Sequence, residues 1–162
     1  MDLSQLFPYL LFLHVLGAIL AFGPTFAFSI MGSMAGAEPQ HSNFSARQTA
    51  AISSKLIYPL AIIQGITGLL LILSGKINVM SSLWLQVSIV LYLLMIGYGL
   101  TVQRNALHRL IDMTGTPPPA DAPPGPPPPA LLATVKQIQR GGMLLGTLIV
   151  VIVFLMVVKP TI

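Results

Sequence analysis

Long apolar stretches follow one another along the chain and are its strongest pattern. Four segments contain no charged residue; they span 3–37, 56–75, 77–103 and 141–158. A helix needs about 20 mostly apolar residues to cross the ~30 Å hydrocarbon core of a membrane. These segments are apolar continuously, whereas the strands of a membrane barrel alternate apolar and polar positions. The pattern therefore predicts membrane-spanning helices.

We expect an all-α fold, a polytopic membrane four-helix bundle that forms one domain over residues 1–162. The predicted spans are 6–31, 50–74, 83–107 and 134–158. The chain starts Met1-Asp2 without a basic region, and its first apolar run is too long for a signal peptide, so we expect the first span to be retained. A proline-rich loop, 112–132, separates the last two spans. Proline has no backbone N–H, which predicts an extended connector there.

Composition narrows the class of protein further. The chain is 54% hydrophobic and 7% charged, against about 25% charged residues in ordinary soluble domains. This excludes a soluble globular enzyme and a nucleic-acid-binding domain, and we expect no nucleic-acid partner. The absence of cysteine excludes a disulfide scaffold and thiolate chemistry. The net charge of +4 is expected to report topology and contact with lipid headgroups.

Basic residues near the span ends predict the orientation in the membrane. Six lie at the ends joined by the first and third loops: Arg47, Lys55, Arg104, Arg109, Lys136 and Arg140. The opposite side carries only Lys76 and Lys159. Loops rich in Lys and Arg stay in the cytoplasm. Both termini are therefore expected on the outer, periplasmic side.

His14 is the most informative polar residue inside a predicted span. Helical spacing places it on one face with Gly17, Ala18 and Ala21, while bulky residues occupy the other face. Small residues line helix–helix contacts in membranes or leave room beside a larger group. A flat macrocycle needs such room to approach an imidazole, so His14 is a candidate ligand of heme iron. The alternative is a hydrogen bond between helices without a cofactor, and the residues alone leave both open.

Other polar side chains are expected at a similar depth. They are Gln64, Ser88, Tyr92 and Thr147, one or two on each of the remaining spans. Together they predict a polar layer in the outer half of the bundle, either a belt that fixes helix register or a pocket for a cofactor or substrate. Met95 follows Tyr92 by about one turn and is a candidate second axial ligand, although methionine also serves as a packing residue.

A second set of candidates gathers at the predicted cytoplasmic boundary. It comprises Lys55, Arg104, Lys136 and Arg140. We expect these side chains to bind anionic lipid headgroups or the carboxylates of another anionic ligand. They would lie nearly 20 Å from His14 in a ~30 Å core, so a macrocycle on His14 would not easily place its propionates among them.

Several short motifs resemble a known group of bacterial four-span membrane proteins. They are Leu13-His14, Trp84-Leu85-Gln86-Val87-Ser88, Arg104 at the end of the third span, and Val157-Val158-Lys159-Pro160. The chain resembles an uncharacterised integral membrane family that is distantly similar to the HemJ-type protoporphyrinogen oxidases and to copper-resistance protein D. This resemblance implies a multi-pass protein of the bacterial inner (cytoplasmic) membrane.

The resemblance also carries expectations about the site. In the HemJ-type enzyme the histidine that matches His14 is thought to ligate heme, which implies heme b as the cofactor. That enzyme has a lysine where this chain has Ser88 and a histidine where it has Gln86, so its second functional residue does not carry over. The copper-resistance similarity would use His14 with Met31, Met34 and Met95.

Three hypotheses about function follow. The first is an integral membrane protein that binds b-type heme through His14. The second is a HemJ-like protoporphyrinogen oxidase, a heme-dependent oxidoreductase. The third is an accessory or structural subunit of a membrane complex without a cofactor, whose polar layer fixes helix packing. Lipids are the expected partners, with a homo-oligomer or a larger membrane complex as further possibilities.

Overall fold

The computed structural model describes residues 3–115 and 126–160, and the described part is helical without strands. Its α-helices are α1 Phe7–Ala37, α2 Ser42–Ile52, α3 Tyr58–Ser74, α4 Leu83–Tyr98, α5 Arg104–Thr114 and α6 Pro129–Val158. Single-turn 3₁₀ helices occupy Leu3–Leu6, Pro39–His41 and Val79–Ser81. Four helical segments within this part are long and apolar enough to cross a membrane. This confirms the all-α four-span fold expected from the sequence.

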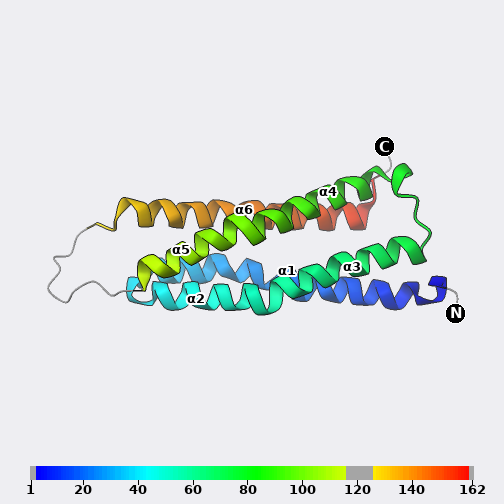
Figure 1. Ribbon diagram of the computed structural model, residues 1–162. Helices are drawn as coiled ribbons and strands as arrows, with labels where there is room; N and C mark the ends of the chain where they lie inside the picture. The colour runs from blue at the N-terminus through cyan, green and yellow to red at the C-terminus, as the bar shows by residue number, and fades with distance from the viewer. Residues whose placement is uncertain (1–2, 116–125, 161–162) are drawn as a thin grey trace.

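Two of the membrane-spanning segments are continuous through a π-helical turn. The turn Ser53–Ile57 joins α2 to α3, and the turn Gly99–Gln103 joins α4 to α5. Inside lipid every backbone N–H and C=O must be paired within the protein, so an unbroken helix is the favoured path for these apolar sequences. Each of the two segments is therefore one long rod (Figure 1).

The helices are longer than the predicted spans at one end of the bundle. The first span was expected to end at 31 and the second to begin at 50, but α1 continues to Ala37 and α2 begins at Ser42. The sequence pattern reports only the hydrocarbon-embedded part, whereas the polar continuation is stabilised by tertiary contacts. The Asn43 amide, for example, donates to the Ile111 carbonyl oxygen of α5 at 2.9 Å. Residues 116–125 of the predicted proline-rich loop, 112–132, lie outside the described residues. The two ends of that loop are helical instead of extended, because α5 continues to Thr114 and α6 begins at Pro129, where the first turn of a helix tolerates proline.

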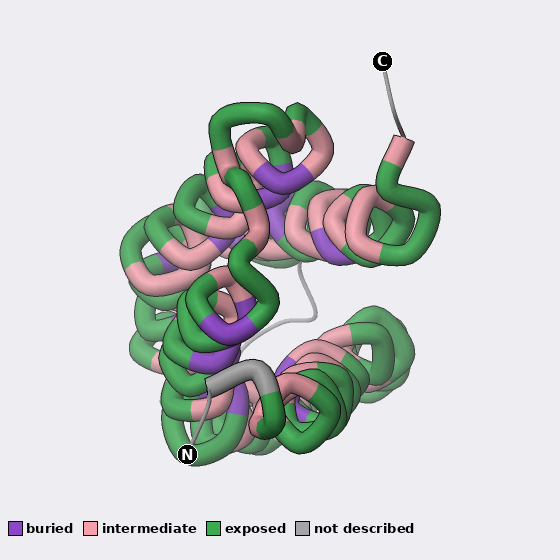
Figure 2. The backbone as a smooth tube through the Cα atoms, turned by 90° about the vertical axis from the view of Figure 1, so that its right-hand side faces the viewer, coloured by how far each residue is buried: buried purple, intermediate pink, exposed green. Residues whose placement is uncertain are grey.

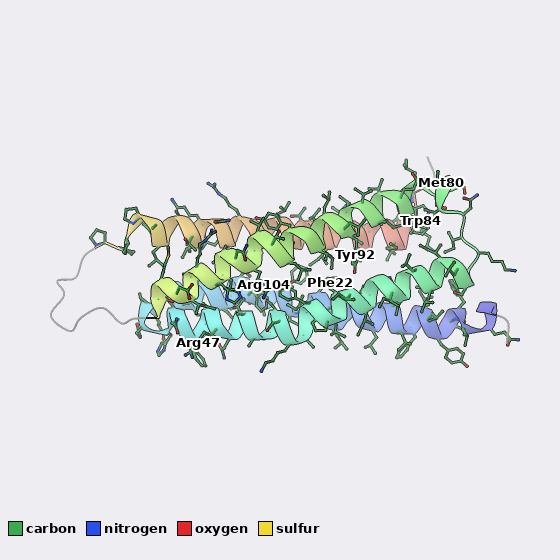
Figure 3. All side chains as sticks on the ribbon, viewed as in Figure 1. Phe22, Arg47, Met80, Trp84, Tyr92 and Arg104 are labelled. Atoms are coloured by element: carbon green, nitrogen blue, oxygen red, sulfur yellow. The ribbon has the colours of Figure 1, made fainter. Side chains whose placement is uncertain are left out.

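The four membrane-spanning segments form two pairs that meet at one end. α1 packs on α3 and α4 packs on α6, while α2 and α5 pack together at the far end. Both chain ends lie at the end where the two pairs diverge, opposite the end formed by α2 and α5 (Figure 1). Arg47 and Arg104 are on the α2–α5 side of the molecule (Figure 3). The side of the membrane that each end faces remains a prediction from charge.

The buried faces of the helices are rich in small residues. Gly17, Ala21, Ala61 and Ser88 are buried, whereas most large apolar side chains are exposed on the outside. Figure 2 shows the buried positions confined to the inner faces of the helices. Small side chains allow helix backbones to approach closely in lipid, and large ones facing acyl chains cost nothing. This division identifies the outer surface as lipid-contacting.

Candidate functional site

His14 lies at the contact between α1 and α3. Its ring is half-buried, with Nδ1 2.9 Å from Thr67 Oγ1 and Nε2 3.1 Å from Gln64 Nε2. His14 is seven residues from the start of α1, and Thr67 is seven residues from the end of α3. At 1.5 Å per residue both are about 10 Å from the same end of the bundle. The structure therefore brings two predicted polar residues, His14 and Gln64, together with Thr67.

The three side chains are linked by hydrogen bonds. The Gln64 amide nitrogen can only donate, so His14 Nε2 accepts and the ring proton is on Nδ1. That proton is donated to Thr67 Oγ1, whose own hydroxyl donates to the Gln64 backbone oxygen at 3.0 Å. Both ring nitrogens of His14 are thus bonded to side chains of α3. A neutral imidazole with both nitrogens engaged is the result.

Two glycines make this arrangement sterically possible. A Cβ atom added to Gly17 would lie 2.8 Å from Gln64 Oε1, and one added to Gly68 would lie 3.3 Å from His14 Cε1. Both distances are shorter than ordinary van der Waals contact, so the helices need glycine at these positions to carry the polar side chains between them. The small-residue face predicted around His14 is thus filled by α3. Gln64 Oε1 is buried and has no hydrogen-bond partner within the described residues.

This geometry does not fit an axial heme ligand. Heme iron needs the lone pair of one ring nitrogen, and His14 Nε2 already accepts from Gln64. The ring also lies against Gly68, so α3 occupies the space through which a macrocycle would have to approach the ring. Met95 is buried on α4, a helix that packs mainly on α6 rather than on α1. The described residues also contain no group of three or more His, Cys, Asp or Glu side chains able to hold a metal ion.

The other members of the predicted polar layer are distributed over different contacts. Ser88 is fully buried and donates to the Trp84 carbonyl oxygen within its own helix. Tyr92 donates from α4 to the Ala61 carbonyl oxygen of α3, and Figure 3 shows it between the two pairs of helices. Tyr92 therefore joins α4 to α3, whereas the bond of Ser88 stays within α4. Neither residue has a hydrogen bond to His14, Gln64 or Thr67 in the described part of the chain.

Thr147 departs from the expected layer, because it is exposed on α6. The inward face of α6 is set by Gly141 and Ile149, which are eight residues apart and both buried. Thr147 precedes Ile149 by two residues, which is about 200° around a helix. Its side chain therefore points away from the bundle, and the sequence could not fix this rotation.

The predicted basic set divides between two places. Lys55 and Arg104 line one cleft together with Tyr58 and His108. Lys136 and Arg140 are exposed on α6, where neither lines that cleft. The grouping of Lys55 with Arg104 depends on how α2 and α3 pack against α5, and this left no signal in the sequence. Thr67 was not among the predicted site residues, although its spacing of three from Gln64 put it on the same face.

Comparison with known families matches residues 8–160 of the chain to the family described as predicted integral membrane protein (DUF2269). No curated protein and no solved structure matches the chain. The family match confirms the expected class of integral membrane protein. These comparisons give no support to a similarity with HemJ-type oxidases or with copper-resistance protein D.

Proposed function

Because the chain belongs to this family of predicted integral membrane proteins (DUF2269), we propose that it is an accessory or structural protein of the bacterial inner membrane. In this proposal His14 holds two helices together instead of binding heme. The protein would work as a non-catalytic bundle. It would present its basic end, the end formed by α2 and α5 with Arg47 and Arg104, to partners in a membrane complex. Heme binding and oxidase activity are the alternatives, and the absorption spectrum and a test of heme synthesis distinguish them from this proposal.

The observation that carries the proposal is the hydrogen bonding of both His14 ring nitrogens to the side chains of Gln64 and Thr67. A histidine that serves a cofactor keeps one ring nitrogen available for it, whereas here both ring nitrogens are hydrogen-bonded to α3. Polar side chains that bond across helices stabilise membrane bundles and fix the register of their helices. The geometry therefore supports a structural role for the intramembrane histidine.

At the basic end, hydrogen bonds between helices hold the helix ends in fixed positions. If the hydrocarbon core begins near Ser74, its ~30 Å thickness ends about 20 residues earlier, near Lys55, so most of α2 extends beyond it. Asn43 also bonds to the Thr114 hydroxyl of α5 at 3.1 Å, and Arg109 donates to the Gln137 amide oxygen of α6 at 2.8 Å. These contacts tie the extended ends of three helices together and support a docking role there.

The experiment uses the full chain, purified in detergent from heme-replete cells. We measure its absorption spectrum and its unfolding in SDS for the unmodified protein, His14→Ala and the control His41→Ala, which changes an exposed histidine in the turn Pro39–His41. We expect no Soret band. We also expect a loss of about 1–3 kcal/mol in the free energy of unfolding for His14→Ala, from two interhelical hydrogen bonds. The control should leave unfolding unchanged.

Three results would overturn the proposal. A Soret band that is present in the purified protein and abolished by His14→Ala would assign heme to His14. Restored heme synthesis in cells that lack protoporphyrinogen oxidase, after expression of this chain, would assign an enzymatic activity. An unfolding free energy that is equal for His14→Ala and the unmodified protein would remove the structural role.

A further inference from the structure

A cleft opens at the basic end between two of the rods. One wall comes from the end of α2, the turn Ser53–Ile57 and the start of α3; the other comes from α5. Its polar side chains include Lys55, Tyr58, Arg104 and His108. The volume is about 280 Å³, just below the ~300–1,000 Å³ typical of pockets for drug-sized ligands. The cleft therefore suits a small anionic group and is too small for a macrocycle.

The depth of the cleft matches the headgroup region of a membrane. Lys55 is 19 residues from Ser74, the end of α3, which corresponds to about 28 Å along a helix. Arg104 is 21 residues from Leu83, the start of α4, or about 32 Å. Both values are close to the ~30 Å thickness of the hydrocarbon core. The two cations thus lie at its boundary, the level at which lipid phosphates are found.

Among the residues that the structure describes, no carboxylate forms an ion pair with the cations of the cleft. Within residues 3–115 and 126–160 the structure shows a single ion pair, between His41 and Glu38, both of them outside the cleft. The nearest acidic residue along α5 is Asp112, four residues after His108, and it does not line the cleft. Two unpaired cations beside low-dielectric lipid favour an anion strongly. A guanidinium and an ammonium together present the donors that phosphate oxygens accept.

The helix geometry that aims these side chains is unusual. The two segments that flank the cleft, α2–α3 and α4–α5, each contain a π-helical turn near the cleft. Such turns are frequent at functional sites. Pro59 accounts for the first, because it lacks an N–H and its ring clashes with the carbonyl four residues earlier. The second, Gly99–Gln103, contains no proline. It inserts one residue before Arg104, which rotates α5 by roughly 100° relative to α4 and helps to set Arg104 and His108 on the cleft side.

We propose that Lys55 and Arg104, assisted by Tyr58 and His108, form a binding site for a phosphate group at this boundary of the membrane. The ligand chemistry is a phosphate ester or a free phosphate held by charge-assisted hydrogen bonds. It has two sources: the headgroup of an anionic phospholipid, or a soluble phosphate compound that enters from the aqueous side. The site goes beyond the structural role proposed above and does not depend on His14.

The experiment measures lipid and phosphate binding to the full chain. Native mass spectrometry counts the phosphatidylglycerol molecules that the detergent-purified protein retains. Thermal unfolding is compared in nanodiscs of phosphatidylglycerol and of phosphatidylcholine, and in detergent with millimolar inorganic phosphate. The variants are Arg104→Gln and Lys55→Gln, and Arg140→Gln is the matched control, since Arg140 is a basic residue at the same end but outside the cleft.

We expect Arg104→Gln to weaken phosphatidylglycerol binding about tenfold, the loss of one charge-assisted hydrogen bond, and Arg140→Gln to leave it unchanged. A second variant tests the site without altering charge. Ala51 lines the cleft and is exposed, so Ala51→Leu should fill the space, keep the fold and reduce binding. Stabilisation by inorganic phosphate that Arg104→Gln abolishes would support the site with a soluble ligand.

Phosphatidylcholine carries a phosphate ester without net charge, so it is the reference for phosphatidylglycerol, and detergent without phosphate is the reference for inorganic phosphate. The proposal is overturned if neither phosphatidylglycerol nor inorganic phosphate stabilises the protein over its reference. It is also overturned if Arg140→Gln weakens binding as much as Arg104→Gln does, because the effect would then be one of total charge. Full binding by Ala51→Leu would exclude the cleft itself. None of these outcomes involves the absorption spectrum or His14, so the site fails or stands separately from the structural role.

Discussion

Thr67→Val isolates one hydrogen bond between two membrane helices. Valine has nearly the shape of threonine, so the change removes the hydroxyl that lies 2.9 Å from His14 Nδ1 and keeps the packing. Hydrogen bonds between membrane helices contribute on average about 0.6 kcal/mol and at most about 1.7 kcal/mol. We therefore expect the unfolding equilibrium constant to rise roughly three- to eighteenfold, since 1.4 kcal/mol corresponds to a factor of ten.

The measurement is SDS-induced unfolding of the full chain in mixed micelles, followed by far-ultraviolet circular dichroism. Thr147→Val makes the same chemical change at an exposed position of α6 and should leave the curve unchanged. Combining Thr67→Val with His14→Ala completes a double-mutant cycle, which separates the pairwise interaction from the cost of each change. The coupling free energy should equal that of the lost bond, about 0.6–1.7 kcal/mol.

Additive effects in this cycle would refute the reasoning. A bond between Thr67 and His14 makes the double variant lose less than the sum of the two single losses, because each single change already removes that bond. If the double variant loses the full sum, the bond contributes nothing to stability. His14 would then be held by something else, and its proposed structural role would have no energetic basis. Equal losses for Thr67→Val and Thr147→Val would point to a general effect of the substitution and lead to the same conclusion.

Further predictions concern the contacts of α4 and α6. Tyr92→Phe removes the hydroxyl that donates to the Ala61 carbonyl oxygen and should lower the free energy of unfolding by about 1 kcal/mol. Tyr9→Phe, at an exposed tyrosine, should leave the free energy of unfolding unchanged. Equal effects of the two changes would contradict the contact between Tyr92 and Ala61. Gly141→Ala places a methyl group against Tyr98 and should cost about 1–3 kcal/mol through overpacking. Gly142→Ala, whose Cβ would meet nothing within 4 Å, should be neutral or stabilising in the same unfolding assay; the reverse order would show that α6 is rotated.

The periodicity of polar and small residues predicted much of the central contact. His14 and Gly17 share a face, as do Gln64 and Gly68, and the structure places these faces against each other. What periodicity could not supply is the pairing, because any two small-residue faces are equivalent in a single sequence. Periodicity predicted space beside the imidazole, but it does not distinguish a neighbouring helix from a macrocycle as what fills that space; in the structure α3 lies there.

The parts that escaped prediction share one physical origin, the rotation of each helix about its own axis. Thr147 was assigned inward and is exposed, because within a span of almost uniform hydrophobicity nothing marks the lipid side. The π-helical turn Gly99–Gln103 rotates every later residue of this segment about the helix axis. It contains no proline, so nothing in the sequence indicated it. The cleft formed by Lys55 and Arg104 depends on that rotation and so became visible only in the folded chain.

The divergence of the two helix pairs has a mechanical consequence. α2 and α5 join the pairs at the basic end, while α3 and α4 separate toward the chain ends (Figure 1). The molecule therefore tapers, and it displaces more lipid area in one leaflet than in the other. The Tyr92 hydroxyl, bonded to α3 part-way along, acts as a tie between two levers hinged at the narrow end. Stretching or bending the bilayer would then do work on this bond and on the contacts between α1 and α6, which also join the two pairs, before it disturbed either pair.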